Sequence, residues 1–489
     1  MVTTTWTTAE RYRPYDQWPT EQLTTLRQQI AQSHWRFGYH IQPTTGLLND
    51  PNGFSYFNGQ WHLFYQAFPY GPVHGLKSWE HLVSDDLMHW EKLGPALIPD
   101  TPLDQQGVYS GSAIAVKDRL FLMYTGNVRD QDWERHPKQN GAWLTTTNQV
   151  TKLTTPLISN PPKTVTEHFR DPQIIEHDGQ YYAFIGAQTT DLTGHVMVYQ
   201  APAVTGPWTL KGDLQFSDQP MGYMVECPNL VFIDDRPVLI FCPQGVSADV
   251  LASENIYPNA YVVGQAFDWE TFSFIDPSPL QNLDAGFDVY ATQAFNAPDG
   301  RALAVSWIGL PDIAYPSDRE GWANGLSVIK DLHLKNDRLV QQPVGVSTIR
   351  QQALQVTMPH PVIPQQSELH FTVPADQQGQ VTIVTDITTN QGLILNIDTA
   401  HGELVVDRAG TGEAVAATYG MTRTANLNAH QPLTGQLLLD HSVFELYLND
   451  GATVLTGRMF PATNADFSLS QTGFTTALGW QGWQLESVN

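Results

Sequence analysis

The chain contains 489 residues, with 49 Asp and Glu against 25 Lys and Arg, so its formal net charge at pH 7 is −24. A surface this acidic repels nucleic acid and anionic membranes, which excludes both as expected partners. Charged residues make up only 15% of the chain and aromatic residues 11%, a composition typical of a folded protein of two or three domains.

The N-terminus and the cysteine content indicate the compartment. Residues 1–20 lack a basic start followed by an apolar run, so no signal peptide is expected. No apolar stretch is long enough to span a bilayer. The two cysteines, Cys227 and Cys242, exclude a disulfide framework and favour reduced thiols. We therefore expect a soluble, cytoplasmic protein.

The first part of the chain shows a helical sequence pattern followed by a pattern of strands and turns. Residues 18–37 are predicted to form a short helix, because Leu23, Leu26 and Ile30 recur at helical spacing. From about residue 38, short alternating runs bounded by Gly, Asn, Asp or Pro predict strands and turns. Examples are residues 61–65, 120–124, 181–185 and 237–241. We expect a helical extension over residues 1–37 and a strand-rich domain over residues 38–345.

Five polar turn motifs recur along this strand-rich domain. Their reference residues are Asp50, Ser110, Asp171, Glu226 and Asp288, and the intervals between them run from 55 to 62 residues. A four-stranded blade with its loops has about this size, and blades repeated around an axis enclose one central channel. The pattern therefore predicts a five-bladed β-propeller in which the motifs meet at the channel.

After residue 345 the strands become short, rich in Gln and Thr, and poor in motifs. Candidate strands are residues 380–386, 392–398, 435–440, 443–449 and 454–460. The NDG sequence at residues 449–451 is typical of a tight turn between two strands. This texture predicts a C-terminal β-sandwich over residues 346–489, which makes the whole chain all-β.

Three of the propeller motifs supply carboxylates, namely Asp50, Asp171 and Glu226. Cleavage of a glycosidic bond needs one ionised carboxylate to attack the anomeric carbon and a second that holds a proton for the leaving oxygen. A third negative charge nearby raises the pKa of the acid. An Asp before Pro is usually only a turn residue, so the hypothesis depends on all three meeting.

Other reactive groups show no comparable pattern. The sixteen histidines lack metal-ligand spacing, and no phosphate-binding glycine loop or dinucleotide motif occurs, so we expect neither a metal nor an organic cofactor. Cys227 has no evident His partner, which favours packing over a nucleophilic role. Trp79, Trp90 and Tyr109 could stack on sugar rings, although packing between blades explains most such aromatics.

The motifs resemble those of glycoside hydrolase family 32, and they occur in the same order and at similar spacing. The resemblance extends from about residue 40 into the C-terminal part. The segments that carry it are NDPNG at residues 49–53, YSGSA at 109–113, RDP at 170–172, ECP at 226–228 and FELYLNDG at 444–451.

The resemblance implies a retaining glycosidase. Asp50 would form a covalent fructosyl-enzyme, Glu226 would act as acid and then base, and Asp171 would stabilise the transition state. Retention requires the two reacting carboxyls to lie about 5–5.5 Å apart. The residues expected to contact the sugar are Asn49, Gln66, His74, Trp79, Tyr109, Ser110, Arg170 and Asp288.

Several positions depart from the family pattern. His74 and Val225 stand where Trp is common, and Glu80 stands where Gly is usual; Leu47 and Leu48 replace an aromatic residue and Met. None of these positions is one of the three carboxylates, so the chemistry is expected to be intact. The departures bear on the preference for the leaving group.

Residues 71–79, 126–130 and 315–322 resemble the members of the family that act inside cells on phosphorylated sucrose. A phosphate bound to so acidic a protein requires cationic side chains. Each basic residue taken alone is more often a surface or ion-paired residue. The phosphate candidates are Lys77, Arg129 and Arg135, and the wider set also includes His74, His136, Lys138 and Arg319.

We therefore expect hydrolysis of the β-fructofuranosidic bond of sucrose-6-phosphate or sucrose. A long open groove would instead favour fructo-oligosaccharides, inulin or levan, and transfer of the fructosyl group to another sugar remains an alternative. A non-catalytic sugar-binding propeller would be expected if one of the three carboxylates were replaced. A homo-oligomer is left open.

Overall fold

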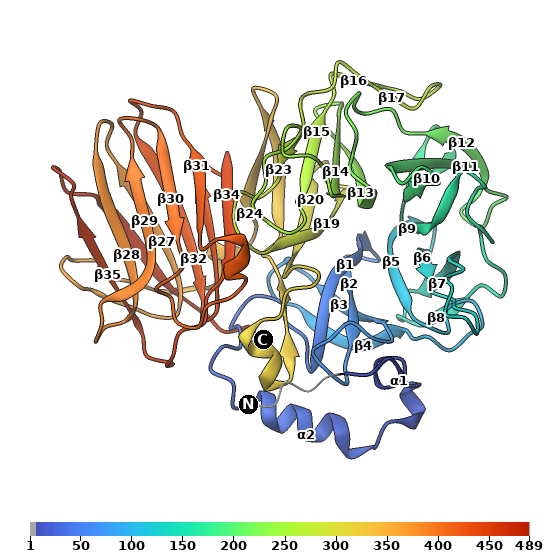
Figure 1. The fold of residues 1–489 in the computed structure, drawn as a ribbon, viewed down its shortest axis with the longest axis horizontal. Coiled ribbons are helices and arrows are strands. Elements are labelled where there is room, and N and C mark those ends of the chain that lie inside the picture. Colours follow the sequence, from blue (N-terminus) through green and yellow to red (C-terminus); the bar gives the residue numbers. More distant parts are fainter. Residues whose placement is uncertain (1–5, 489) are drawn as a thin grey trace.

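The computed structural model describes residues 6–488. Two bodies of strands lie side by side: a fan of sheets coloured blue to yellow, and a pair of stacked sheets in orange and red (Figure 1). The chain is thus a five-bladed β-propeller followed by a β-sandwich, as predicted. The expected domain limits at residues 38 and 346 remain a prediction.

Each blade is an antiparallel sheet whose first strand lies nearest the axis. The first three blades are β1 (Gly46–Phe57), β2 (Gln60–Phe68), β3 (Ser78–Ser84), β4 (Glu91–Leu97); β5 (Val108–Val116), β6 (Arg119–Gly126), β7 (Lys138–Thr145), β8 (Val150–Lys152); and β9 (Val165–His177), β10 (Gln180–Thr189), β11 (Gly194–Ala201), β12 (Thr209–Asp213). The last two are β13 (Met224–Ile233), β14 (Arg236–Gln244), β15 (Ala260–Val263), β18 (Gln281–Asn282); and β19 (Val289–Asn296), β20 (Ala302–Ile308), β23 (Lys330–Lys335), β24 (Arg338–Pro343). The predicted runs at residues 61–65, 120–124, 181–185 and 237–241 are the second strands of blades one to four.

Short strands complete the propeller. The pair β16 (Ala266–Asp268) and β17 (Ser273–Ile275) forms a separate hairpin, and β22 (Gly325–Leu326) pairs with β20. After blade five, β21 (Trp322–Ala323) returns to pair in parallel with β1, where Gly46 lies opposite Trp322. This pair joins the last blade to the first.

The innermost strand of every blade is interrupted by a β-bulge at the recurring motif. The pairing register shifts between Asn49 and Pro51 in β1 and between Glu226 and Asn229 in β13. Equivalent register shifts occur where β5 pairs with β6, where β9 pairs with β10, and where β19 pairs with β20. A bulge leaves a residue unpaired and re-aims its side chain. The motifs recur because each blade turns one segment toward the axis.

Five polar side chains, which we call the channel ring, join each inner strand to the next. Gln173, for example, donates to the carbonyl of Leu230 at 2.9 Å and accepts from its N–H at 2.6 Å. Gln293 closes the ring by accepting from the N–H of Phe54 at 2.7 Å. The members of the ring are Asn52, Ser112, Gln173, Asn229 and Gln293. In its own blade, each ring residue comes two or three positions after the residue at the bulge or just before it. Those preceding residues are Asp50, Ser110, Asp171, Glu226 and Tyr290.

The sandwich contains two six-stranded sheets. One holds β25 (Arg350–Ala353), β36 (Gly479–Leu485), β27 (Gln366–Val373), β32 (Leu433–Asp440), β33 (Val443–Leu448) and β34 (Thr453–Arg458). The other holds β26 (Val362–Ile363), β35 (Phe467–Thr472), β28 (Gln378–Asp386), β29 (Gln391–Asp398), β30 (Glu403–Asp407) and β31 (Thr422–Asn426). Apolar side chains from both sheets fill one core between them. The predicted turn at residues 449–451 connects β33 to β34.

Buried charges lie where the sandwich meets the propeller. His40 lies between Asp440 and Glu445, with each ring nitrogen 2.9 Å from one carboxylate. Lys330 of blade five approaches the other oxygen of Glu445 at 3.5 Å. Burying such groups costs several kcal/mol unless they are paired. The two bodies therefore join through matched charges as well as through apolar contact.

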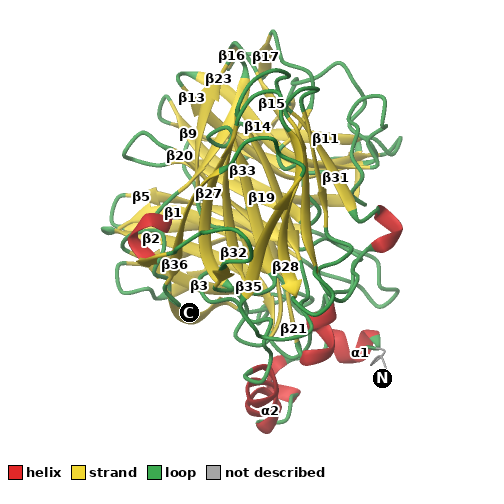
Figure 2. Ribbon diagram, turned by 90° about the vertical axis from the view of Figure 1, so that its left-hand side faces the viewer, coloured by secondary structure: helices red, strands yellow, loops and turns green. Residues whose placement is uncertain are grey.

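The N-terminal segment lies against blade one and the base of the sandwich, where the helices appear red in Figure 2. It contains α1 (Thr8–Arg11) and α2 (Glu21–Ile30). The predicted helix over 18–37 is therefore shorter than expected, because the helical apolar spacing ends at Ile30. Beyond it, Trp35 packs into a core cluster and donates to the carbonyl of Pro461 at 2.8 Å. Among the described residues, no helix has the length and apolar character needed to cross a membrane.

Candidate active site

Asp50 emerges from the bulge of β1 at the axis. Its Oδ1 accepts from Asn49 at 3.0 Å, and its Oδ2 accepts from Gln66 at 3.2 Å and from the hydroxyl of Ser110. Burial raises the pKa of Asp50 above its ordinary value. The hydrogen bonds from Ser110 and Asn49 and the charge of the nearby Lys77 oppose this rise without cancelling it. Three donors hold this carboxylate in a single orientation, as a nucleophile requires.

Glu226 projects from the bulge of β13. Its Oε1 accepts from Arg170 twice, from Nε at 2.9 Å and from Nη2 at 2.6 Å. Its Oε2 accepts from Gln244 and from the hydroxyl of Tyr290, both at 2.6 Å. Burial raises the pKa of Glu226, but the Arg170 charge and these hydrogen bonds outweigh burial and hold the pKa below its ordinary value.

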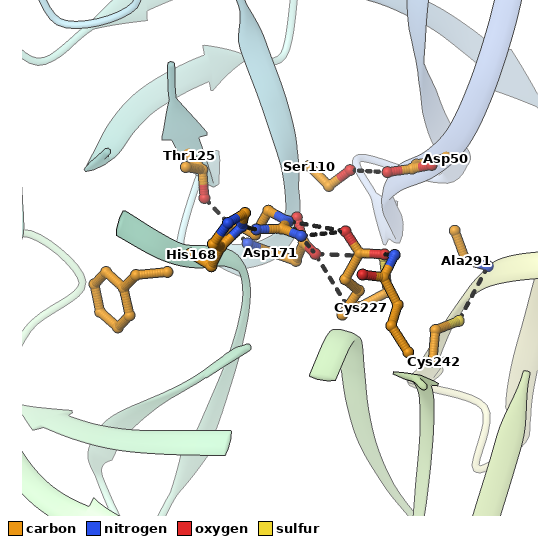
Figure 3. A network of polar contacts seen from close by, with 12 residues as sticks. Asp50, Ser110, Thr125, His168, Asp171, Cys227, Cys242 and Ala291 are labelled. Atoms are coloured by element: carbon orange, nitrogen blue, oxygen red, sulfur yellow. Dashed lines mark hydrogen bonds and ion pairs between the residues drawn. The ribbon is translucent and has the colours of Figure 1, made fainter. Parts of the chain in front are cut away.

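Asp171, from β9, lines the same cavity as the other two acids. Its backbone φ is +65°, an uncommon conformation that marks functional sites when the surroundings enforce it. Its N–H donates to Thr125 at 3.1 Å, and its Oδ2 accepts from the N–H of Cys227 at 3.1 Å. Figure 3 shows Asp171 facing Cys227, and Asp50 bound to Ser110.

Burial raises the pKa of Asp171 to about 7; Arg170 opposes this rise, and the charges of Glu226 and Asp50 add to it. The protonation state of Asp171 therefore depends on the charges of the other two acids.

One cavity of about 300 Å³ contains all three acids, from blades one, three and four. Predicted residues that line it are Asn49, Asp50, Gln66, His74, Lys77, Tyr109, Arg135, Arg170, Asp171 and Glu226. Ser110 contributes through its bond to Asp50. The structure therefore brings most of the predicted site together.

Two of the predicted residues that line the cavity, His74 and Arg135, each lie beside aromatic or imidazole rings. The ring of His74 lies 6.0 Å from that of Trp307 and edge-on to it. Burial holds the pKa of His74 well below its usual range, with the charge of Lys77 adding to this. The Nη1 of Arg135 lies 3.5 Å from His168, and its guanidinium group lies 5.9 Å from the ring centre of Tyr109.

Lys77 is only 3% exposed and lies deeper than a phosphate candidate at the rim. Its ammonium donates to the side-chain oxygen of Asn49. Burial lowers the pKa of Lys77 to about 7, although Asp50 opposes the shift. This position favours holding Asn49 beside Asp50 over binding a phosphate at the cavity mouth.

The structure places three predicted residues away from the cavity. Trp79 is fully buried and donates to the carbonyl of Tyr109 at 3.1 Å, so it supports the site from beneath. Arg129 bonds the carbonyl of Trp133 on an exposed loop. Asp288, which precedes β19, is buried and pairs with Arg408 of the sandwich. Trp79 and Asp288 are therefore too deeply buried to contact a sugar, whereas Arg129, which forms a β-bridge with Arg135, stays a predicted phosphate candidate.

Further residues line the cavity that were not among the predicted site residues, including Arg11, Tyr12, His168, Gln244 and Tyr290. Tyr290 occupies the place expected for Asp288, because the bulge of blade five follows Tyr290. That two-residue offset is visible in the FDVY motif. Arg11 and Tyr12 come from the N-terminal segment, and no local pattern indicates their place.

The remaining candidate ligands and nucleophiles offer little chemistry. Burial raises the pKa of both Cys227 and Cys242 well above its ordinary value, which disfavours thiolates. Among residues 6–488, one group has metal-ligand geometry, namely Asp130, Glu134 and His136 on an exposed loop. The 2.9 Å bond between His136 and Asp130 already accounts for their proximity.

The arrangement provides a positioned carboxylate, a second carboxylate that can carry a proton, and a third in the same cavity. Such a set can cleave a glycosidic bond. The cavity has the size of a site for a small molecule.

Comparisons with known proteins agree with this chemistry. Residues 40–343 match the glycosyl hydrolases family 32 N-terminal domain, and residues 337–483 match the glycosyl hydrolases family 32 C-terminal domain. The chain is 49% identical over 492 residues to a sucrose-6-phosphate hydrolase of Pediococcus pentosaceus, covering 98% of this chain and 96% of that protein.

Two solved structures are similar along nearly their whole length. A sucrose-6-phosphate hydrolase from Lactobacillus gasseri is 44% identical with a TM-score of 0.94, covering 99% of this chain and all of that one. A Bombyx mori GH32 beta-fructofuranosidase variant in complex with sucrose is 28% identical with a TM-score of 0.84, covering 96% and 97%.

Proposed function

Because the chain belongs to glycosyl hydrolase family 32, we propose that its cavity hydrolyses the β-fructofuranosidic bond of sucrose-6-phosphate, with Asp50 as nucleophile and Glu226 as acid and base. One observation supports this most strongly. Carboxylates from three different blades line a single cavity, and each is held by its own set of donors.

In the first step, an oxygen of Asp50 attacks C2 of the fructosyl unit while Glu226 donates its proton to the bridging oxygen. The C2–O bond to the other hexose breaks, and a fructosyl ester of Asp50 forms. Asn49, Gln66 and Ser110 fix the attacking carboxylate so that its orientation is set before the substrate arrives.

In the second step, Glu226 removes a proton from water, and the water oxygen attacks C2. The ester bond to Asp50 breaks, the β-configuration is restored, and Glu226 is protonated again for the next cycle. Gln244 and Tyr290 hold Oε2 of Glu226 through both steps. Asp171, in the same cavity, stabilises positive charge that develops on the sugar ring.

Glu226 must be protonated before it can act as an acid, yet Arg170 favours its ionised form. Bound substrate excludes water from the cavity, and desolvation raises the pKa of a carboxyl group. We therefore propose that the acid form is populated mainly in the complex.

The preference for a phosphorylated disaccharide rests on two supports. The relatives at 49% and 44% identity carry the name sucrose-6-phosphate hydrolase. The cavity also contains cationic side chains, including Arg135, which has no carboxylate partner among the described residues. Its volume of about 300 Å³ suits a disaccharide better than a long fructan.

Since phosphorylated sugars do not cross bilayers unaided, we also propose a cytoplasmic location.

The test is kcat/KM of the purified protein on sucrose-6-phosphate, sucrose and a short inulin oligomer. We expect the phosphorylated sugar to be preferred, and NMR of the first product to show β-fructofuranose. Asp50→Asn and Glu226→Gln should lose activity on all three substrates. Equal cleavage of free sucrose would leave a general β-fructofuranosidase, and inverted product would contradict the assigned roles.

A further inference from the structure

The wall of the cavity includes a part of the chain that lies outside the matched family domains. The N-terminal domain match begins at residue 40, but Arg11 and Tyr12 line the cavity. Arg11 ends α1, and Tyr12 follows it; both belong to the segment of residues 6–39, whose helices lie below blade one in Figure 1. The segment therefore contributes directly to the site.

Specific contacts seat this segment on the loop between β2 and β3. The carbonyl of Arg11 accepts from the N–H of Leu76 at 2.7 Å, and Tyr15 donates to the carbonyl of Leu76 at 2.6 Å. Two glycines make the close approach possible. A Cβ at Gly75 would lie 2.6 Å from the carbonyl oxygen of Arg11, and one at Gly71 would lie 2.2 Å from the ring of Trp6.

Arg11 lacks an acidic partner although acids outnumber bases 49 to 25 in this chain. Its Nε donates to the carbonyl of His74, and within residues 6–488 no carboxylate lies within ion-pair distance of its guanidinium group. An arginine left unpaired in so acidic a protein, at the wall of a cavity, is available to an anionic ligand.

Arg135 is in the same situation on the adjoining wall. Its Nε is buried and has no hydrogen-bond partner in the described part of the chain. Both Arg135 and Arg170 approach the same nitrogen of His168, at 3.5 and 3.0 Å. Since Arg170 holds the proposed acid Glu226, Arg135 lies on the side of the cavity where the leaving hexose must sit.

Tyr12 and Tyr109 occupy the wall between the two arginines. Tyr12 packs edge-on against Trp133 at 5.0 Å, and it interacts with Tyr109, over whose ring Arg135 lies. The wall thus runs from Arg11 through two phenols to Arg135. Two guanidinium groups and two hydroxyl groups are donors that suit the oxygens of a phosphate monoester.

We propose that Arg11 of the N-terminal segment, together with Arg135, binds the phosphate on the leaving hexose and so determines the preference for the phosphorylated substrate. This inference rests on the proposed function, since it requires a phosphorylated disaccharide. It assigns specificity to a segment outside the matched family domains, whereas the bond-breaking groups all lie within the propeller.

The experiment compares Arg11→Ala, Arg11→Lys and the wild type on sucrose-6-phosphate and on sucrose. Loss of a charged hydrogen bond costs about 1.5–3 kcal/mol, which corresponds to about 10- to 100-fold. We expect Arg11→Ala to lower kcat/KM for the phosphorylated sugar by this factor more than for sucrose, mainly through KM. Inhibition by glucose 6-phosphate should weaken to a similar extent, and Arg11→Lys should restore part of both.

Arg13→Ala is the matched control, because Arg13 lies over Trp18 at 4.6 Å and does not line the cavity; it should leave the substrate ratio unchanged. If Arg11→Ala lowers activity on both sugars equally, Arg11 only supports the loop at His74 and the inference is wrong. If the wild type prefers the phosphorylated sugar and Arg11→Ala keeps that preference, the inference fails alone. If the wild type shows no preference, the proposed substrate fails with it.

Discussion

Arg170 directs two of its N–H groups at one oxygen of Glu226, at 2.9 and 2.6 Å, and leaves the other oxygen to Gln244 and Tyr290. One oxygen of the proposed acid is therefore saturated by a cation, while the other receives neutral donors. The geometry fixes the carboxyl group firmly, and the charge of Arg170 also lowers the pKa of Glu226.

Replacing Arg170 tests this control. Arg170→Gln removes the charge that lowers the pKa of Glu226, so Glu226 should stay protonated to higher pH. We expect the alkaline limb of the kcat/KM profile to move upward, while kcat falls about 100-fold from lost positioning. Arg301→Gln, which breaks a surface pair with Asp299, should change neither. An unmoved alkaline limb would mean that Glu226 is not the group titrating there.

Asp50→Asn separates chemistry from stability. A nucleophile replaced by an amide should cost activity about 10⁴-fold or more. Because burial raises the pKa of Asp50, its ionised form costs the folded state free energy at neutral pH. The variant should therefore melt at the same temperature as the wild type or higher. A large drop in melting temperature would show that activity was lost through unfolding instead.

The charge cluster between propeller and sandwich should make stability depend on pH. Burial lowers the pKa of His40, but Asp440 and Glu445 outweigh it and raise the pKa to about 9, above an ordinary value of 6.5. A raised pKa of this kind gives stability that is complete below about pH 6.5 and lost as the pH rises through 9. Burial raises the pKa of Glu445, but Lys330 and His40 lower it to about 2, so its contribution is lost only as the pH falls from about 4.5 to about 2.

His40→Gln should reveal this dependence. Removing the cation leaves two buried carboxylates without it, which costs about 3–5 kcal/mol, and the alkaline decline in melting temperature should flatten. His89→Gln, at an exposed residue that bonds Asp86, serves as the control and should keep the wild-type profile. An unchanged slope in His40→Gln would assign the decline to other groups.

Because the channel ring joins the inner strands that carry the three acids, we expect a substitution in the ring to change kcat as well as stability. Gln293→Ala leaves the N–H of Phe54 and the carbonyl of Gly111 without their partner. We expect a loss of about 2–4 kcal/mol in the free energy of unfolding, together with lower kcat, although Gln293 does not line the active-site cavity. Gln219→Ala, at an exposed position, should be neutral. Full kcat with lowered stability would show that the ring holds the blades without positioning the acids.

Much of this architecture follows from local sequence. The motifs around Asp50, Asp171 and Glu226 were predictable because a bulge at the axis requires unusual backbone, and Asp-Pro or Glu-Cys-Pro sequences provide it. Cys227, beside Glu226, has a φ of +50° for the same reason. The strand runs of the blades and of the sandwich were equally local.

What the sequence did not indicate depends on contacts between distant segments. Asp288 fits the period of the motifs, but Arg408, 120 residues later, draws its carboxylate into the sandwich contact. Trp79 resembles a sugar-stacking residue until neighbouring strands bury it completely. Arg11 reaches the cavity only because the segment folds back across blade one, which spacing along the chain cannot express.

In each inner strand the bulge separates two kinds of residue only two or three positions apart. The residue at the bulge or just before it differs from blade to blade, as Asp50, Ser110, Asp171, Glu226 and Tyr290 do, and it lines the active-site cavity or contacts a residue that does. The ring residue just beyond it is polar in every blade and faces the next blade. The side chain at this position can therefore be replaced in one blade at a time while the channel ring, which sets the spacing of the blades, stays intact. This makes the scaffold open to evolutionary change at the positions that perform chemistry.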